Sequence, residues 1–389
     1  MSRPAAAEPR PALRDEFPIL ARTNYLVSHS LGAMPRGARA GLAAYADLWE
    51  QRGVEAWSER WWGMPLEVGD RIAGILGAPA GSVSMHQNVT LMQAIVLSAF
   101  DWRGPRNRLI CCELDFPSCL YLYEGLRSQG AEVVRVPSDD GVTVDPERLA
   151  AAVDERTAAV CFSHVIYRTA ALVDPAPVVE RARRVGAVTV LDAYQSVGTV
   201  PVDVGALGVD VLTGGSVKWL CGGPGAGYLY VRPETRPRLK PRLTGWMAHP
   251  RPFAFEDGPM EPTDGPYRYL NGTPGVPALY AAGAGYELVA RVGVAAIRER
   301  SQRLTERIVA GADARGWRVV SPRDPARRGG SVSVAVPQAE RVAGELARRG
   351  VHVDWRPGAG LRIGPHFYNT EAEIDAALDA VGEILAAHP

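Results

Sequence analysis

The sequence predicts an α/β fold, with a mostly parallel sheet that helices cover on both faces. Between residues 109 and 231, short β-rich runs alternate with runs that have helical spacing. Intervening helices of this length are typical of right-handed βαβ units, and such units build parallel sheets. Near the C-terminus, a further pattern of strands and helices predicts a second, compact α+β unit.

The large unit begins with helices and continues with the alternating pattern. Apolar spacing predicts helices over Pro35–Gln51 and Pro65–Gly77, the second of which ends at a glycine. The expected strands are Leu109–Leu114, Val133–Pro137, Ala158–Val165, Ala187–Asp192, Val209–Leu212 and Ala226–Val231. The helices expected between the earlier strands are Ser118–Gln129, Pro146–Val153 and Pro175–Val185.

The last third of the chain predicts the smaller unit. A long helical stretch covers Pro277–Gly316. The expected elements after it are strands at Ser331–Val336, Val351–Trp355 and Leu361–Ile363, and helices at Gln338–Arg349 and Glu371–Ala387. We expect an N-terminal arm over residues 1–30, flexible over 1–22, a large domain over 31–285 and a small domain over 286–389.

The composition is typical of a soluble globular protein and argues against several partners. Hydrophobic residues make up 47% of the 389 residues, and 43 basic residues balance 43 acidic ones. This balance provides no basic surface for nucleic acid or an anionic membrane, and no apolar run of about 18 residues could span a bilayer. The five cysteines contain no CxxC pair, which predicts reduced thiols and a cytoplasmic location. No metal-ligand spacing is present, so we expect no metal.

Lys218 and Asp192 carry the strongest indication of chemistry. Lys218 is the only lysine in the first 239 residues and lies between an apolar segment and the glycine-rich loop 222–227. Asp192 ends a predicted strand 26 residues earlier. A pyridoxal phosphate (PLP) enzyme needs a lysine to form the Schiff base and a carboxylate to keep the pyridine nitrogen protonated. Either residue alone is more often structural, but together they predict a PLP site.

The glycine-rich loop and two helix starts permit functional and structural interpretations. Loop 222–227 lacks a following Lys-Ser/Thr and leads into a strand, so it is not a nucleotide-binding loop. Its small residues let the backbone pass close to a cofactor. The segments 85–90 and 272–275 each precede a helix, where backbone N–H groups can bind phosphate or a side chain can simply cap the helix.

Three further side chains also leave two interpretations open. Arg362 lies in a short strand, where it binds a carboxylate if buried or faces solvent at a sheet edge. His164 follows a strand and stacks on a cofactor ring or satisfies hydrogen bonds in the core. Trp246 lines a substrate pocket or packs with other aromatic residues.

With these residues assembled, the chain resembles the class V aminotransferase group of fold type I PLP enzymes, and within it the bacterial kynureninases. The resemblance covers nearly the whole length. The segments that carry it are Tyr25–Gly32, Phe116–Cys119, Ser163–Thr169, Val217–Gly225, Gly245–His249, Gly272–Pro274 and Leu361–Gly364. It implies a large domain with a mostly parallel seven-stranded sheet, a small C-terminal α+β domain, and a homodimer with its site at the subunit interface.

The resemblance also implies residue roles. Lys218 would form the Schiff base, and Asp192 would hold the pyridine nitrogen. The other implied cofactor contacts are Val89, Thr90, Phe116, Ser118, His164, Thr169, Gln195, Ser216, Trp246 and, from the neighbouring subunit, Thr273. The implied substrate contacts are Arg362, which would bind the α-carboxylate, His29 and Tyr167.

The chain departs from the kynureninase pattern at four positions. Val217 replaces a tyrosine that precedes the lysine, Gln195 a histidine and Cys119 an aspartate, and His29 replaces an asparagine. We therefore expect an enzyme that acts on an α-amino acid, by kynureninase-like hydrolysis of a Cβ–Cγ bond or, alternatively, by transamination or C–S/β-elimination. A cysteine desulfurase would need a later cysteine, and none follows Cys221. A PLP-sensing regulator would need a DNA-binding domain, for which the arm leaves no room.

Overall fold

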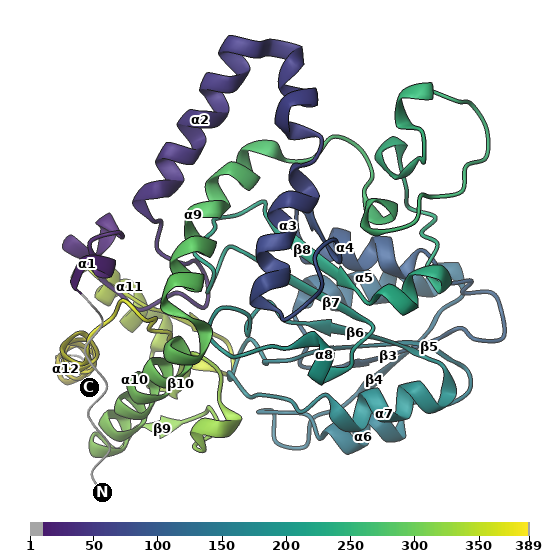
Figure 1. Cartoon of the computed structure of the whole chain (residues 1–389). Coiled ribbons are helices and arrows are strands. Elements are labelled where there is room, and N and C mark those ends of the chain that lie inside the picture. The colour runs from purple at the N-terminus through teal and green to yellow at the C-terminus, as the bar shows by residue number, and fades with distance from the viewer. Residues whose placement is uncertain (1–10, 388–389) are drawn as a thin grey trace, which may run out of the picture.

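The computed structural model describes residues 11–387, and the statements below concern that part of the chain. A seven-stranded sheet forms its centre (Figure 1), in the order β2-β8-β7-β6-β5-β3-β4. All neighbouring strands are parallel except β8, which runs antiparallel to both β2 and β7. The strands are β2 (Val83–His86), β3 (Arg108–Cys112), β4 (Glu132–Val136), β5 (Thr157–Ser163), β6 (Val188–Asp192), β7 (Val211–Gly215) and β8 (Gly227–Val231). The expected mostly parallel sheet and its six predicted strands are confirmed.

Helices cover both faces of this sheet, as expected. In Figure 1, α4 (Val89–Leu97) and α5 (Pro117–Leu126) lie on one side, and α6 (Pro146–Ala151) and α7 (Ala176–Val185) on the other. Successive residues of a strand point to opposite faces. Leu109 and Cys111 therefore join one apolar cluster, while Ile110 and Cys112 join another. A short helix, α8 (Val204–Leu207), precedes β7.

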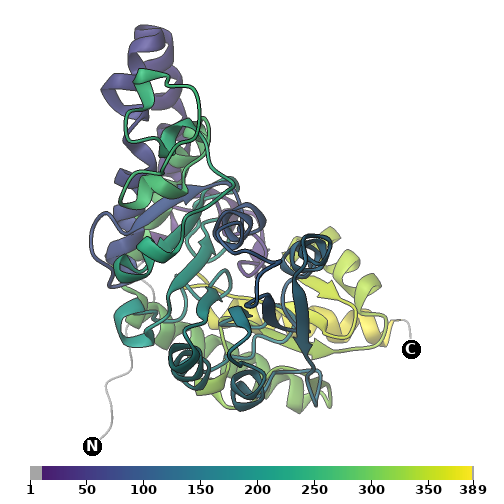
Figure 2. The ribbon, with the colours of Figure 1, turned by 90° about the vertical axis from the view of Figure 1, so that its right-hand side faces the viewer.

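Two helices project from the sheet as a hairpin. α2 (Arg36–Arg52) packs along α9 (Val276–Val292), and α3 (Met64–Ile75) returns to the sheet beside β2. Gly41 permits the close approach of α2, because a Cβ at this position would overlap the carbonyl oxygen of Tyr280. Figure 2 shows this hairpin rising on the same side of the molecule as the segment around residues 246–258.

The small unit packs helices against a four-stranded antiparallel sheet, in the order β12-β13-β10-β9. The expected long helix is in fact two, α9 and α10 (Val294–Ala314), because Gly293 adopts a φ of +82° between them. The other elements are β9 (Arg318–Val319), β10 (Val332–Ala335), α11 (Ala339–Arg348), β11 (Val351–His352), β12 (Asp354–Arg356), β13 (Gly360–Ile363) and α12 (Glu371–Ala386).

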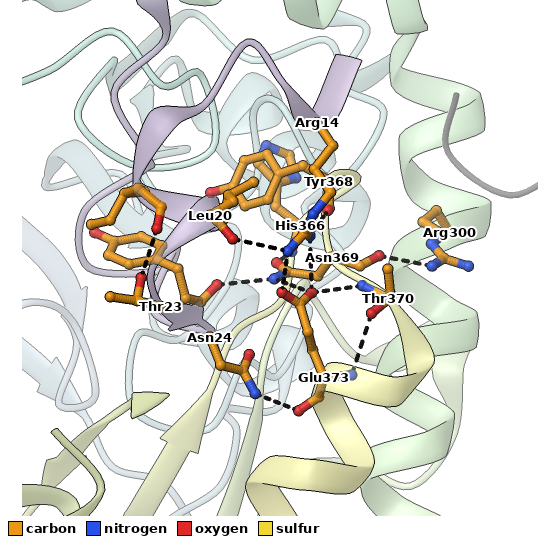
Figure 3. A network of polar contacts seen from close by, with 12 residues as sticks. Arg14, Leu20, Thr23, Asn24, Arg300, His366, Tyr368, Asn369, Thr370 and Glu373 are labelled. Atoms are coloured by element: carbon orange, nitrogen blue, oxygen red, sulfur yellow. Dashed lines mark hydrogen bonds and ion pairs between the residues drawn. The ribbon is translucent and has the colours of Figure 1, made fainter. Parts of the chain in front are cut away.

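The expectation of a flexible arm over residues 1–22 is wrong for its later part. Arg14 donates to Glu373 Oε1 at 2.6 Å and to the carbonyl oxygen of Tyr368 at 2.7 Å (Figure 3). Phe17 is buried, with its ring centroid 4.5 Å from that of Tyr368. β1 (Asn24–Tyr25) then pairs in parallel with β11. Residues 1–10 lie outside the described part, and the three domain boundaries stay predictions.

Three strands were not expected from the sequence. β1, β2 and β9 are each short and lack an alternating pattern. No helix among residues 11–387 is both long and apolar enough to span a membrane. The same residues contain no cluster of three metal-ligating side chains.

Candidate active site

A cavity of about 750 Å³ opens at the carboxyl ends of the parallel strands. Ser163 ends β5 and Asp192 ends β6, while Lys218 follows β7. Because these strand ends meet at one edge of the sheet, residues far apart in the sequence line one space. The structure brings eight of the expected site residues to this cavity: Val89, Thr90, Phe116, Ser118, Tyr167, Asp192, Gln195 and Lys218.

Lys218 presents its amine between two aromatic rings. Its Nζ lies 5.7 Å from the ring centroid of Phe116 and 5.4 Å from that of Tyr194. It makes no hydrogen bond or ion pair with any residue of the described chain. Burial lowers the pKa of this amine from 10.5 to about 8, although Asp192 acts in the opposite direction. A larger share of the amine is therefore neutral near pH 7, as a nucleophile or base requires.

The backbone of Lys218 is held by the loop after β1. The N–H of Gly32 donates to the carbonyl oxygen of Val217 at 2.8 Å. A Cβ on Gly32 would overlap the carbonyl oxygen of Lys218. The glycine of the Tyr25–Gly32 segment therefore fixes the position of the lysine.

Asp192 is a buried carboxylate with one weakly bound oxygen. Its Oδ1 accepts the backbone N–H of Tyr194 at 2.9 Å, and its Oδ2 accepts only the thiol of Cys119 at 3.7 Å. Burial raises its pKa, while the N–H of Tyr194 and the charge of Lys218 oppose that shift. A cationic hydrogen-bond donor at Oδ2 would stabilise the charged form, and a protonated pyridine nitrogen is such a donor.

The N-terminus of α4 forms the other end of the cavity. Asn88 caps the helix, because its side chain accepts the N–H of Leu91 at 3.0 Å. Val89 and Thr90 line the cavity directly after this cap. The segment is therefore both a capped helix start and a wall of the cavity, where backbone N–H groups and the helix dipole favour an anion. A free amine, a buried carboxylate and an anion-binding helix end around one cavity fit PLP.

Three expected cofactor residues do not line this cavity. Ser216 Oγ donates to the carbonyl oxygen of Ala226 at 2.6 Å and contacts the hydroxyl of Tyr286. Thr169 Oγ1 donates to the carbonyl oxygen of Val142 at 2.6 Å. His164 is buried and lies just outside the lining, with a pKa lowered to about 4 by burial. Their cofactor roles stay predictions.

Trp246 and Thr273 lie outside the cavity as well. Trp246 belongs to an aromatic cluster with Trp62, Phe253 and Phe255 and is 39% exposed. Thr273 lines a second cavity of about 360 Å³, which shares Gln87 and Leu91 with the first. Within one chain, neither residue reaches Lys218.

Arg362 already holds an anionic partner inside the protein. Its Nε donates to Asp354 Oδ1 at 2.7 Å and its Nη2 to Asp354 Oδ2 at 2.5 Å. Its Nη1 donates to the carbonyl oxygen of Tyr167 at 2.6 Å, so the arginine is tied to the cavity wall. Arg362 is 3% exposed, which makes it a buried ion-paired arginine and not a solvated edge residue. Neither Arg362 nor the neighbouring His29 lines the cavity, and their expected contacts with a substrate stay predictions.

His29 completes this buried group. Its Nε2 lies 3.0 Å from Asp354 Oδ1, and its Nδ1 has no partner in the described structure. Burial, followed by the charge of Arg362, lowers the pKa of His29 to about 4, so the ring is neutral and donates through Nε2. Burial alone would raise the pKa of Asp354, but hydrogen bonds from His29 and Arg362 hold it well below its usual range.

This arrangement predicts a large effect of Gly364→Ala. A Cβ at residue 364 would overlap Nδ1 of His29, whereas a Cβ at Gly344 on α11 would meet nothing. We expect Gly364→Ala to destabilise the protein by about 1–3 kcal/mol, because a packed side chain must move. Gly344→Ala should leave the thermal unfolding temperature unchanged or raise it. Equal unfolding temperatures for Gly364→Ala and the wild type would show that His29 is not held as described.

Comparisons with known proteins agree with this geometry. The Aminotransferase class-V family model matches residues 67–376. The chain belongs to this family. The match confirms the expected family, whose members are PLP-dependent enzymes.

Two curated relatives match over nearly the full length. A kynureninase from Pseudomonas fluorescens is 32% identical over 386 residues, covering 96% of this chain and 92% of the relative. A kynureninase from Burkholderia pseudomallei (strain K96243) is 31% identical over 391 residues, covering 97% and 93%. The chain thus resembles whole kynureninases and not one domain of them.

Solved structures establish the fold. The apo cysteine desulfurase of Thermococcus onnurineus NA1 has a TM-score of 0.85 at 22% identity, covering 98% of this chain and all of that one. A C-DES mutant with glycine covalently linked to its PLP cofactor has a TM-score of 0.87 at 20% identity, covering 95% and 99%. The chain has the fold of type I PLP enzymes, as expected.

Proposed function

We propose that the protein is a PLP-dependent enzyme that acts on an α-amino acid. One observation carries this proposal: the free amine of Lys218 lies between Phe116 and Tyr194 in the cavity that Asp192 also lines. When bound, PLP would supply an electron sink for carbanion chemistry at the substrate. Val89 and Thr90 would hold its phosphate, and Asp192 would hold its ring nitrogen.

The side chains of the cavity would then have distinct tasks. Lys218, with its lowered pKa, would move a proton at the substrate Cα. Phe116, which is 39% exposed, would cover one face of the cofactor ring. The free N–H groups of Arg362 would hold the substrate α-carboxylate near Tyr167 and His29, in a group that stays neutral or paired in the absence of substrate.

For the reaction, we propose kynureninase-like hydrolysis of a Cβ–Cγ bond. The two kynureninases at 31–32% identity over the full length support it. Transamination or cleavage of a C–S bond is the second candidate, because the chain departs from the kynureninase pattern at Gln195, which lines the cavity, and at Cys119, which contacts Asp192. Gln195 Nε2 donates to the carbonyl oxygen of His29 at 2.9 Å, and its Oε1 accepts from Trp219 at 3.2 Å, so it has a structural task.

We also propose a cytoplasmic homodimer. The aromatic cluster at Trp246 leaves Phe253 and Phe255 62% and 74% exposed, so two neighbouring aromatic side chains are open to contact with a partner. A second copy that covers it could bring Thr273 toward the cofactor of its partner. The five cysteines are unpaired and buried, which suits a reducing compartment.

The reaction is tested by supplying purified enzyme with kynurenine, 3-hydroxykynurenine and a panel of amino acids, with products identified by mass spectrometry. Alanine together with an anthranilate would establish the hydrolase. A keto acid together with an aminated cofactor would establish transamination, and release of sulfur from cysteine or cystine would establish the lyase. A protein that never binds PLP would refute the whole proposal.

The lowered pKa of Lys218 predicts how cofactor attachment depends on pH. The amine reacts in its neutral form, whose fraction rises about tenfold per pH unit below the pKa. Because that pKa is about 8, the attachment rate should rise up to about pH 8 and then level off. Asp192→Asn should move the plateau to lower pH, because Asp192 raises the pKa of Lys218. A wild-type rate that still rises between pH 9 and 10 would contradict the lowered pKa.

A further inference from the structure

Tyr194 is a cavity residue that neither the sequence patterns nor the resemblance pointed to. It follows Asp192 by two residues and lines the same cavity as Lys218 and Thr90. Its ring lies against the end of β7, where a Cβ on Gly215 would overlap ring carbon Cζ. The glycine at residue 215 is thus what makes room for this ring. The fold therefore provides a defined position for this ring at the end of β7.

The hydroxyl of Tyr194 points to the start of α4. The backbone N–H of Val89, the first residue of that helix, is in polar contact with it. Among the residues that the structure describes, no acceptor receives the O–H of Tyr194. The phenolic proton is therefore free for a ligand at the end of the cavity where the helix dipole favours an anion.

The charge state of the phenol suits this task. Burial raises the pKa of Tyr194 far above neutral, and the nearby charge of Asp192 raises it further. The hydroxyl consequently keeps its proton at physiological pH and acts as a donor. Two other hydroxyls of the cavity already have partners: Ser163 Oγ donates to Asp115 at 2.7 Å, and the hydroxyl of Tyr167 accepts from Arg168 at 2.9 Å.

We propose that Tyr194 is a phosphate-binding residue of the cofactor site, whose hydroxyl donates to the phosphate group beside the N-terminus of α4. Val217, which lines the cavity next to Lys218, has no hydrogen-bonding group on its side chain. Tyr194 thereby adds a second hydroxyl donor to that of Thr90 at the α4 end of the cavity. This inference rests on the proposed function, because it assumes that PLP is the ligand.

The test compares PLP with pyridoxal, which lacks the phosphate but keeps the aldehyde. The dissociation constants of both for cofactor-stripped protein are measured by fluorescence for wild type, Tyr194→Phe and Tyr121→Phe. Tyr194→Phe keeps the ring and removes only the hydroxyl. Tyr121, on α5, is 76% exposed and serves as the matched control. We expect Tyr194→Phe to weaken PLP about tenfold or more and pyridoxal less than about twofold, as for a lost hydrogen bond to a charged group.

A second variant displaces the hydroxyl of Tyr194 without changing that residue. Gly215→Ala should displace the ring of Tyr194 and reproduce the selective loss of PLP, whereas Gly125→Ala, where a Cβ meets nothing, should not. Equal losses for PLP and pyridoxal in Tyr194→Phe, or no loss for either, would overturn the inference. A wild type that binds neither would instead refute the proposed function, so the two failures are distinguishable.

Discussion

Lys218→Ala is expected to lower turnover by about 10³-fold or more and to abolish covalent attachment of the cofactor. Lys218 provides the only amine that lines the cavity. The substitution removes a group that makes no hydrogen bond within the described structure, so the fold should persist. The measurement is steady-state turnover, together with the visible absorbance of the bound cofactor.

The chain offers a matched control for this variant. It contains two lysines, and the other, Lys240, is exposed and pairs with Glu261 at 2.8 Å. Lys240→Ala should change turnover by less than about twofold, because exposed ion pairs contribute little. Addition of a small primary amine should restore part of the activity of Lys218→Ala. Turnover of Lys218→Ala within tenfold of the wild type would show that another group performs the proton transfer.

Asp192→Ala should have the second largest effect, a loss of about 10²–10³-fold in turnover. The buried carboxylate lies at the strand end beneath the cavity, with Oδ2 bound only by the thiol of Cys119. Without its charge, nothing in the cavity wall would keep a cofactor ring nitrogen protonated. The Kd for PLP should rise as well, because a charge-assisted hydrogen bond is lost.

Asp210→Asn is the control for loss of an acid from the same sheet. Asp210 accepts from Thr189 Oγ1 at 3.0 Å and from Thr235 Oγ1 at 2.8 Å, away from the cavity. It should lower the unfolding temperature and leave turnover of the folded protein unchanged. If Asp192→Ala behaved in the same way, Asp192 would be a structural residue and the proposed role would be lost.

The sequence predicted those parts of the site that depend on strand ends. Asp192 and Lys218 each follow an apolar run, and parallel strands bring such positions together whatever the details of packing. Phe116 lies in a segment that resembles the family, and the resemblance also implied a cofactor contact at Thr90, in the helix start 85–90. The sequence also predicted the helix start at Asn88. It left open whether this start is a cap or an anion site, because the two have the same local pattern.

Other contacts depend on register and on distant packing, which a single sequence does not contain. Asp354 meets Arg362 because β12 and β13 pair with these two residues opposite each other. The ring of Phe17 packs against those of Phe367 and Tyr368, which follow it by about 350 residues in the sequence. One sequence feature, the glycine pair before Ser216, indicates that another group packs closely on the end of β7. The sequence does not say that this group is the ring of Tyr194, which lies against Gly215.

The central claim is that Lys218 carries the cofactor, and one measurement tests it directly. Protein incubated with PLP is reduced with borohydride, which fixes any cofactor joined to a lysine through a C=N bond, and its peptides are sequenced by mass spectrometry. The label is expected on Lys218, with Lys240 unlabelled in the same sample. Label on Lys240 alone, or on neither lysine, would contradict the account.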